Sequence, residues 1–364
     1  MESAIEDGKL QGLVSLRIEN LRNIQRMQID LDAPVVILSG GNGAGKTTVL
    51  EAIYLLARGR SFRGRKAGPI TTNGECCTSI KGFCTGQRGK LSLGFYRDRT
   101  GTQRSLDSAP WENQDATHFP ISVKLIGENA QSLLDGDPAL RRTYLDWNVF
   151  HVEHRFGRLR KNFHRTLSQR NAVLRSKDWA DGIWSRSFVE LAEEVNRYRE
   201  QFFTDWRVQF LQLCPTFDFL ADCDIRFRRG WSDRDSLGDA LTQVRAAEVS
   251  CGYTLIGPSR ADFTVERDGK AACFSRGQAK ALVCLLQLAA DRVHAEHGVG
   301  ASVWLLDDLE AELDQDTCSK IWSIFAATEA QRFVTRVSTR PMADEWTAGG
   351  KACLFHVEHG VLTP

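Results

Sequence analysis

The feature that most constrains the fold of this chain is the stretch VVILSGGNGAGKTTVLEAIYLLARG, residues 35–59. It begins with VVIL, an apolar and β-branched run with the length of a buried strand. It continues into TTVLEAIYLLA, where apolar residues recur at helical spacing. Between them lies Gly40-x-x-x-x-Gly45-Lys46-Thr47, the phosphate-binding P-loop pattern in its required strand–loop–helix setting. The sequence therefore predicts an α/β nucleotide-binding domain.

Each residue type in this loop has a chemical reason. Glycines let backbone N–H groups converge on phosphate oxygens at the positive end of the following helix. Lys46 supplies a point charge for the β- and γ-phosphates, and the Thr47 hydroxyl suits Mg²⁺. The nucleotide-binding residues predicted in this loop are Gly40, Gly41, Asn42, Gly43, Ala44, Gly45, Lys46, Thr47 and Thr48.

A second short apolar run, VWLL at residues 303–306, ends in Asp307 and Asp308. A carboxylate at the C-terminal edge of a buried parallel strand points to the crevice where ligands bind. We expect Asp307 to hold Mg²⁺, directly or through water, and Asp308 to orient or deprotonate the attacking water. Acidic residues also cap helices, so this interpretation depends on the complete P-loop upstream.

A second loop with serine and glycine, FSRGQAK at residues 274–280, precedes the apolar helical segment ALVCLLQLAA. Ser275 is a good helix N-cap, a structural role that is compatible with function. Free amides and a hydroxyl at a helix N-terminus also suit an anion. The residues expected to bind nucleotide in this loop are Ser275, Arg276, Gly277 and Gln278.

The order of these features is informative. Second loop, helix, acidic strand and then Glu312-Leu313-Asp314 follow each other as in ABC-type ATPases. In that class the second loop contacts the γ-phosphate of the ATP held by a partner subunit. The order therefore predicts an ATP-dependent, head-to-tail homodimer that buries two ATP molecules.

Much of the sequence between the two loops is typical of two long helices. Apolar residues recur at three- and four-residue steps from position 156 to 174 and from 188 to 206. The segment SKDWADG, residues 176–182, supplies a turn between them. We expect a short antiparallel helical hairpin.

Basic residues gather in two places. Residues 155–177 contain eight Lys or Arg and no acid, and residues 58–66 form a similar run. A solvated charged face is the ordinary explanation, although the alternating signs of a surface salt-bridge network are absent. Contact with DNA phosphates is the alternative. The candidate DNA contacts are Arg63, Arg65, Arg158, Lys161 and Arg165.

The composition limits the class of protein. The net charge is +1, so the whole chain is no polycation. No apolar run reaches the roughly 20 residues of a membrane span. The N-terminus lacks the apolar core of a signal peptide, so a cytoplasmic location without membrane partners is expected. The ten cysteines form no Cys-x-x-Cys pair, and three His-x-x-His pairs lack a third ligand; we expect buried free thiols and structural or surface histidines.

Together these motifs resemble the RecF family, compact members of the SMC/ABC ATPase class. The resemblance runs from about residue 13 to 362. Its blocks are LRI (16–18) with LRN (21–23), GGNGAGKTTVLEAIYLLARGRSFR, RRTYLDW (141–147), GPSRADF (257–263), SRGQAK and LLDDLEAELD. The order of the blocks makes the resemblance specific, which the P-loop alone would not.

The resemblance implies a protein that binds ATP and Mg²⁺, dimerises, and clamps DNA at single-strand gaps or single-/double-strand junctions. Such proteins act with RecR and RecO, help to load RecA, and use weak ATP hydrolysis to reset the clamp. The residues carried over by motif are Asp308, Lys46 and Glu128 for catalysis, Thr47 and Asp307 for the metal, and Ser275, Arg276, Gly277 and Gln278 for contact across the dimer.

Three positions depart from the family pattern. Gly127-Glu128-Asn129 stands where Pro-Glu-Asp is usual, so Glu128, whose family counterpart senses metal and water, lies in an altered motif. Ser259 stands where the family often has His. No switch histidine follows the strand near residue 334; either Thr335 or Ser338 takes its place, or no residue does.

The expected fold is α/β: an ABC/SMC-type P-loop ATPase head built from residues 1–115 and 250–364, with a helix-rich lobe, residues 116–249, inserted between them. The alternative function is an ABC-class ATPase of a defence or transport system that grips a protein partner. A transporter would place its second loop nearer the P-loop, and a defence protein usually carries an effector domain, for which little sequence remains. A small-molecule kinase would explain only the P-loop.

Overall fold

The structure is a computed structural model that describes residues 10–31, 33–64, 68–86, 89–111, 122–176, 182–300, 302–337 and 352–363. The chain divides into two compact units. Unit 1 is Met1–Ala130, Arg276–Asp291 and Gly298–Pro364, and unit 2 is Gln131–Ser275 and Arg292–His297. The expected boundaries, 115/116 and 249/250, differ from these divisions. The reason is strand pairing: the strand after residue 122 pairs inside unit 1, and the sheet that includes residues 262–271 lies inside unit 2.

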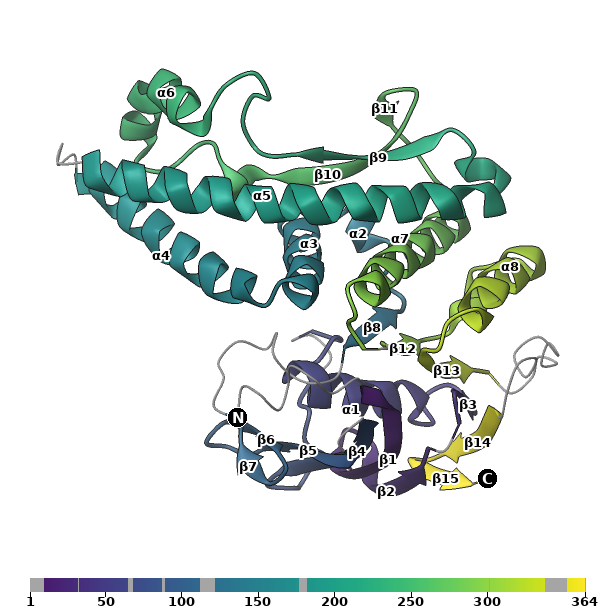
Figure 1. The fold of residues 1–364 in the computed structure, drawn as a ribbon. Helices are drawn as coiled ribbons and strands as arrows, with labels where there is room; N and C mark the ends of the chain where they lie inside the picture. The colour runs from purple at the N-terminus through teal and green to yellow at the C-terminus, as the bar shows by residue number, and fades with distance from the viewer. Residues whose placement is uncertain are drawn as a thin grey trace. The chain divides into compact units, whose positions relative to one another are not determined.

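Unit 1 contains two six-stranded sheets (Figure 1). The antiparallel sheet has the order β2-β1-β4-β5-β6-β7, formed by β1 Leu10–Leu21, β2 Ile24–Asp30, β4 Thr78–Gly86, β5 Gly89–Arg97, β6 Thr102–Leu106 and β7 Ala109–Pro110. The other sheet has the order β15-β14-β3-β13-β12-β8, formed by β3 Val35–Ser39, β8 Val123–Ile126, β12 Val303–Leu306, β13 Gln331–Arg336, β14 Ala352–Glu358 and β15 Val361–Thr363. Its strands are parallel except β15, so we call it the parallel sheet.

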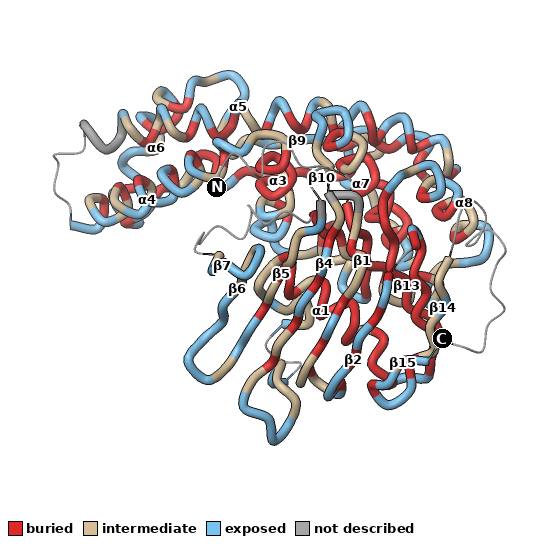
Figure 2. The backbone as a smooth tube through the Cα atoms, turned by 60° about the horizontal axis from the view of Figure 1, so that its bottom comes forward, coloured by how far each residue is buried: buried red, intermediate tan, exposed pale blue. Residues whose placement is uncertain are grey.

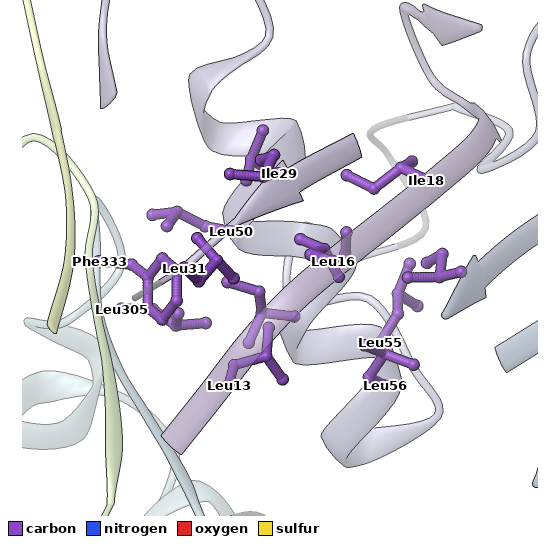
Figure 3. Packing of buried hydrophobic residues seen from close by; sticks show 14 of the residues in the cluster. Leu13, Leu16, Ile18, Ile29, Leu31, Leu50, Leu55, Leu56, Leu305 and Phe333 are labelled. Carbon is purple, nitrogen blue, oxygen red and sulfur yellow. The ribbon is translucent and has the colours of Figure 1, made fainter. Parts of the chain in front are cut away.

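Helix α1, Lys46–Arg58, packs against strands of both sheets. The apolar residues on one side of the helix are all buried: Val49, Leu50, Ile53, Leu56 and Ala57. Ala52 and Leu55, on other sides, are buried too. Figure 3 shows its leucines among Leu16 of β1 and Leu305 and Phe333 of the parallel sheet. A helix buried on several sides needs apolar residues nearly all round, which explains the run VLEAIYLLA.

One buried amide joins the two sheets. Gln331 begins β13, and its side-chain oxygen accepts a hydrogen bond from the Leu13 N–H of β1 at 2.7 Å. Its side-chain nitrogen donates to the Leu13 carbonyl at 2.9 Å and to the Ala33 carbonyl at 3.2 Å. A buried amide without partners costs about 1–3 kcal/mol, so these bonds favour one alignment of β1 against β13.

Unit 2 combines helices with a three-stranded sheet of order β11-β10-β9. Its elements are α2 Ser132–Asp135, α3 Pro138–Val152, α4 Arg155–Ser176, α5 Gly182–Leu213, β9 Cys223–Arg228, α6 Leu237–Cys251, β10 Asp262–Arg267 and β11 Lys270–Ala271. Helix α7, Arg276–Glu296, begins in unit 1 and ends in unit 2, and α8, Gln315–Ala326, lies in unit 1.

The expected antiparallel helical hairpin is confirmed (Figure 1). The rings of Phe163 and Phe188 are 5.6 Å apart, and those of Phe156 and Tyr198 are 6.1 Å apart. The lower-numbered residue of α4 contacts the higher-numbered residue of α5, so the two helices run in opposite directions. Most of the predicted turn, residues 177–181, lies outside the described residues.

Two blocks of the family resemblance meet inside unit 2. Arg141 of RRTYLDW forms two hydrogen bonds with the Asp262 carboxylate of GPSRADF, at 2.6 and 2.9 Å. Arg142 donates to the Ala261 carbonyl at 3.0 Å. A bidentate arginine–carboxylate pair fixes direction as well as distance. Segments 120 residues apart in the sequence are thereby held in one register.

Two arginines of the acid-free stretch pair with acids from other elements. Arg160 donates to Asp146 of α3 at 2.9 Å. Arg170 lies 2.6 Å from Glu248 of α6 and also donates to Thr254. The side chains of Arg170 and Glu248 are 3% and 0% exposed. The Arg160 side chain is still 40% exposed. Arg170 belongs to a buried ion pair, so a solvated or DNA-facing interpretation is wrong for this arginine.

The structure also bears on the cysteines, on metal-ligand groups and on membrane spans. All ten cysteines are free, but Cys76, Cys251 and Cys273 are exposed, so the expectation of burial is wrong for these three. Among the described residues, no group of three or more His, Cys, Asp or Glu could hold a metal. No helix in the described part of the chain is long and apolar enough to cross a membrane.

The buried pair generates a stability prediction. We expect Arg170→Met to lower the free energy of unfolding by about 3 kcal/mol or more, because it leaves the Glu248 carboxylate buried without its cation. Arg165→Met, an exposed arginine on the same helix, should change it by no more than about 0.5 kcal/mol. Urea denaturation followed by tryptophan fluorescence measures both. Equal stabilities of the two variants would contradict the prediction.

Candidate functional site

The P-loop joins β3 to α1, and each part has a local reason for its conformation. All five residues of β3 are buried, as expected for a parallel strand covered on both faces. Gly40, Gly43 and Gly45 have φ values of 153°, 76° and 118°. A Cβ at Gly40 would collide with the Val357 carbonyl oxygen of β14. Glycine is therefore required at Gly40 both by conformation and by space.

Lys46 begins α1, and its ammonium group turns back over the loop. The Nζ donates to the Gly40 and Gly41 carbonyls, each at 2.9 Å, and the residue is 5% exposed. Gly41, Asn42 and Gly43 are exposed. A fixed cation beside an exposed backbone loop at a helix N-terminus is suited to an anion with several oxygens, such as a polyphosphate.

Two residues from opposite ends of the chain brace this loop. The Asn23 amide donates to the Gly43 carbonyl at 3.1 Å and accepts from the Thr48 hydroxyl at 3.0 Å. The Gly360 N–H, in the turn between β14 and β15, donates to the Ala44 carbonyl at 2.8 Å. Neither Asn23 nor Gly360 was predicted to have a role in the site. Asn23 lies in LRN, a block of the family resemblance to which no function was given, and this was the one sequence signal that pointed to it.

The predicted metal residues meet at the carboxyl edge of the parallel sheet. Asp307 directly follows β12, and its Oδ1 accepts a hydrogen bond from the Thr47 hydroxyl at 2.9 Å, although the residues are 260 positions apart. The Thr335 hydroxyl, from β13, donates to the same oxygen at 2.7 Å. A hydroxyl and a carboxylate oxygen are hard ligands of the kind that Mg²⁺ binds.

Both backbone polar groups of Asp308 are hydrogen-bonded to side chains. Its φ and ψ are 46° and 50°, the left-handed conformation, which is uncommon for a residue with a side chain. Its N–H donates to the Thr335 hydroxyl at 2.9 Å, and its carbonyl accepts from the Lys280 Nζ at 3.0 Å. Burial, followed by the neighbouring Asp307 carboxylate, raises the pKa of the Asp308 carboxyl above its usual range. The result is an aspartate with a fixed backbone and a carboxyl group that is more basic than usual.

Thr335 was one of two residues expected at the position of the switch histidine. It is 1% exposed and bonds to both neighbours, Asp307 and Asp308. Ser338, the other candidate, lies outside the described residues. Lys280 was missed as a functional residue. It ends the SRGQAK block, is 4% exposed, and also lies 3.8 Å from the Glu312 carboxylate.

The second loop meets α7 where the two units divide. Ser275 and Arg276 are exposed, and α7 begins at Arg276. A Cβ at Gly277 would lie 2.8 Å from the Glu312 carbonyl oxygen, so glycine allows the start of α7 to approach the segment after Asp308. Gln278 is half-buried in the first turn of the helix.

Glu128 follows β8 at the same sheet edge as Asp307. Residues Gly127 to Ala130 form a turn closed by a 3.0 Å backbone hydrogen bond, and a Cβ at Gly127 would lie 3.6 Å from the Asp307 Cβ. The Glu128 side chain is exposed. The turn therefore borders the site through its backbone.

The five candidate DNA residues have different surroundings. Arg63 lies 3.6 Å from Glu51, a fully buried carboxylate that also pairs with Arg22 at 2.8 Å, so Arg63 has a structural partner that the sequence did not reveal. Arg65 lies outside the described residues. Arg158, Lys161 and Arg165 are exposed on α4, where Figure 2 shows buried and exposed residues alternating along the helix.

Comparison with known proteins places this geometry in a family. The model described as RecF/RecN/SMC N terminal domain matches residues 12–349. A protein of Stutzerimonas stutzeri (strain A1501) named DNA replication and repair protein RecF is 32% identical over 96% of this chain and 97% of its own length. A protein of the same name from Yersinia pestis bv. Antiqua (strain Angola) is 33% identical over 96% and 98%.

Solved structures agree at the level of the fold. The chain superimposes with a TM-score of 0.81 and 21% identity on the structure of the recombination mediator protein RecF-ATP in the RecFOR pathway, with 96% of each chain covered. The head of an Smc protein bound to the C-winged helix domain of ScpA gives a TM-score of 0.56 at 11% identity, again over 96% of each chain. The ABC/SMC-type fold expected from the motifs is confirmed, and the chain belongs to the RecF family.

Proposed function

We propose that the chain is an ATP-dependent DNA-binding clamp that dimerises on ATP and acts at single-strand gaps or single-/double-strand junctions. The observation that carries the proposal is the convergence of Lys46, Thr47, Asp307 and Asp308 at one edge of the parallel sheet. Open α/β sheets bind ligands outside the carboxyl ends of their strands. The relatives named as DNA replication and repair proteins support DNA as the partner.

ATP is the substrate in this proposal, and ADP and phosphate are the products. Lys46 neutralises charge on the terminal phosphates, and the exposed backbone of residues 41–43 donates to them. Thr47 and Asp307 would hold Mg²⁺, which supplies Lewis-acid polarisation of a phosphoryl oxygen when bound. Asp308 orients the attacking water and takes its proton. Turnover is slow and resets the clamp.

Partners are proposed from family membership. A solved relative is described as acting in the RecFOR pathway. RecO and RecR are accordingly proposed as partners of this chain in the cytoplasm, with loading of RecA as the indirect outcome. Glu128 is proposed to sense the metal or the water from the turn after β8.

Ser275, Arg276, Gly277 and Gln278 are proposed to contact the ATP of a second copy. We expect wild-type protein to sediment as a DNA-bound dimer on a gapped duplex only with Mg²⁺-ATP, and as a monomer when the metal is chelated. Ser275→Arg should stay monomeric and bind ATP as the wild type does, because a bulky side chain blocks the loop from the partner's nucleotide. Sedimentation velocity with a fluorescent duplex measures this. Normal dimerisation of Ser275→Arg would refute the role across the dimer.

Lys280 and Thr335 are proposed as positioning residues for Asp308. Lys280→Met should lower ATP turnover roughly 10- to 100-fold, because the Asp308 backbone loses one of its two side-chain bonds. ATP affinity should be unchanged. Lys280→Arg should recover part of the turnover, since it keeps a donor and the charge. Phosphate release and calorimetric ATP binding measure the two effects.

Two further variants serve as controls for the Lys280→Met experiment. Asp308→Asn removes the proposed base and sets the floor for turnover. Lys320→Met removes a half-buried lysine of α8 that pairs with Asp316 at 2.8 Å, and it should leave turnover unchanged. If Asp308→Asn is inactive while Lys280→Met turns over at the wild-type rate, Lys280 has no positioning role.

The alternative function is a defence or transport ATPase whose helical arm grips a protein. Variants of α4 distinguish it from the DNA-binding clamp. Neutralising Arg158, Lys161 and Arg165 together to Gln should weaken DNA binding. About three fewer phosphate contacts should flatten the slope of log affinity against log salt by roughly 2.7. Fluorescence anisotropy at several salt concentrations measures the slope. An unchanged affinity and slope would favour a protein-contact face instead.

A further inference from the structure

Tyr253 is an aromatic residue that unit 2 holds at its surface. It is 42% exposed, while Gly252 and Thr254 on either side are buried and Thr254 is hydrogen-bonded to α4. Thr254 donates through its N–H to the Asn171 side chain at 2.8 Å and accepts from Arg170. A Cβ at Gly252 would lie 3.0 Å from the Arg175 side chain, and Gly252 has a φ of 73°. The backbone around Tyr253 is therefore fixed against the C-terminal end of α4.

Arg260 stands beside the Tyr253 ring, and its loop is also fixed. Its guanidinium carbon is 5.8 Å from the ring centroid, and the residue is exposed. The carbonyl of Pro258 accepts from Arg199 of α5 at 2.7 Å, and the carbonyl of Ala261 accepts from Arg142 at 3.0 Å. Arginines thus hold the backbone on both sides of Arg260, which presents an exposed cation without loop rearrangement.

The chain segments that contain this Tyr253–Arg260 pair and α4 carry no exposed acid. Residues 155–176 contain no Asp or Glu, and residues 240–261 contain only Glu248, which is fully buried and paired with Arg170. The exposed cations Arg158, Lys161, Arg165 and Arg175 follow one another along one side of α4, separated by three, four and ten positions, and Arg175 contacts Gly252. These spacings keep the cations on one face of the helix. The face ends beside Tyr253.

An exposed aromatic ring next to a row of cations has a specific physical use. Stacking on an aromatic side chain requires a base whose face is open, which single-stranded DNA offers and duplex DNA does not. Cations beside the ring track the phosphates of either form. A single strand therefore supplies both the flat group and the row of anions that this surface can bind.

We propose that Tyr253 is a stacking platform for an unpaired base of single-stranded DNA, with Arg260, Arg175 and the exposed face of α4 contacting the phosphates of the same strand. The inference rests on the proposed function, since it names where the clamp meets the single strand. It explains why the GPSRADF block is held by arginines of two helices. On this surface, single-stranded DNA would contact both the ring and the cations, whereas duplex DNA would contact the cations alone.

The test compares single-stranded and fully duplex oligonucleotides of equal length with full-length protein and Mg²⁺-ATP. Tyr253→Ala should weaken single-strand binding about tenfold, the size expected for one stacked base, and change duplex binding less than twofold. The salt dependence should be unchanged, because no cation is lost. Tyr253→Phe should bind as the wild type does, since the ring is retained. A single strand carrying 5-iododeoxyuridine should photocrosslink to the peptide that contains residue 253.

Controls separate this inference from the proposed function. Tyr96→Ala removes a tyrosine of similar exposure, 40%, in unit 1 and should change neither affinity. Equal loss of single-strand and duplex binding in Tyr253→Ala, or no loss, would overturn the stacking role while the clamp proposal stands. Failure of the wild type to bind either DNA with Mg²⁺-ATP would instead overturn the proposed function, and the inference with it.

Discussion

The parallel register of β3, β13 and β12 is the constraint on which the site depends. β13 lies between the other two strands and pairs with both, so the three strands end at the same edge. The P-loop leaves that edge from β3, and Asp307 and Asp308 leave it from β12. Thr335 is the second-last residue of β13. Thr47 and Asp307 can therefore share a hydrogen bond across 260 residues of sequence. A shift of one residue in either pairing would turn these side chains to the other face.

Around this edge the protein fixes the backbone before it presents side chains. Asn23 and Gly360 hold the P-loop carbonyls, and Lys280 and Thr335 hold Asp308 in a left-handed conformation. Such a conformation costs of order 1–3 kcal/mol and persists only where surrounding contacts determine it. Unit 2 follows the same logic with buried arginines, which bond backbone carbonyls and carboxylates from distant segments. Preorganisation of this kind removes the ordering cost from the binding step.

Local sequence was least informative about which charged side chains form ion pairs and which stay exposed. The acid-free basic stretch was expected to face solvent or DNA as a whole, yet Arg160 and Arg170 find acids on α3 and α6. Arg63 similarly pairs with Glu51 of α1. Ion pairs between elements depend on which surfaces the fold brings together, and spacing along one helix carries no record of them. The residues that remain exposed on α4 could be identified only after those pairs were known.

The sequence alone determined the elements whose chemistry is local. A strand, a glycine loop and Lys-Thr at the start of an apolar helix specify the P-loop, because turn geometry and helix-end electrostatics act over a few residues. The strand before Asp307, the helical hairpin and the family itself could be read in the same way. Tertiary structure decided the pairing of Thr47 with Asp307, the bonds of Lys280 and Thr335 to Asp308, and the boundaries between the units. Each of these rests on contacts between segments far apart in the chain, which arise from strand register and burial rather than from local pattern.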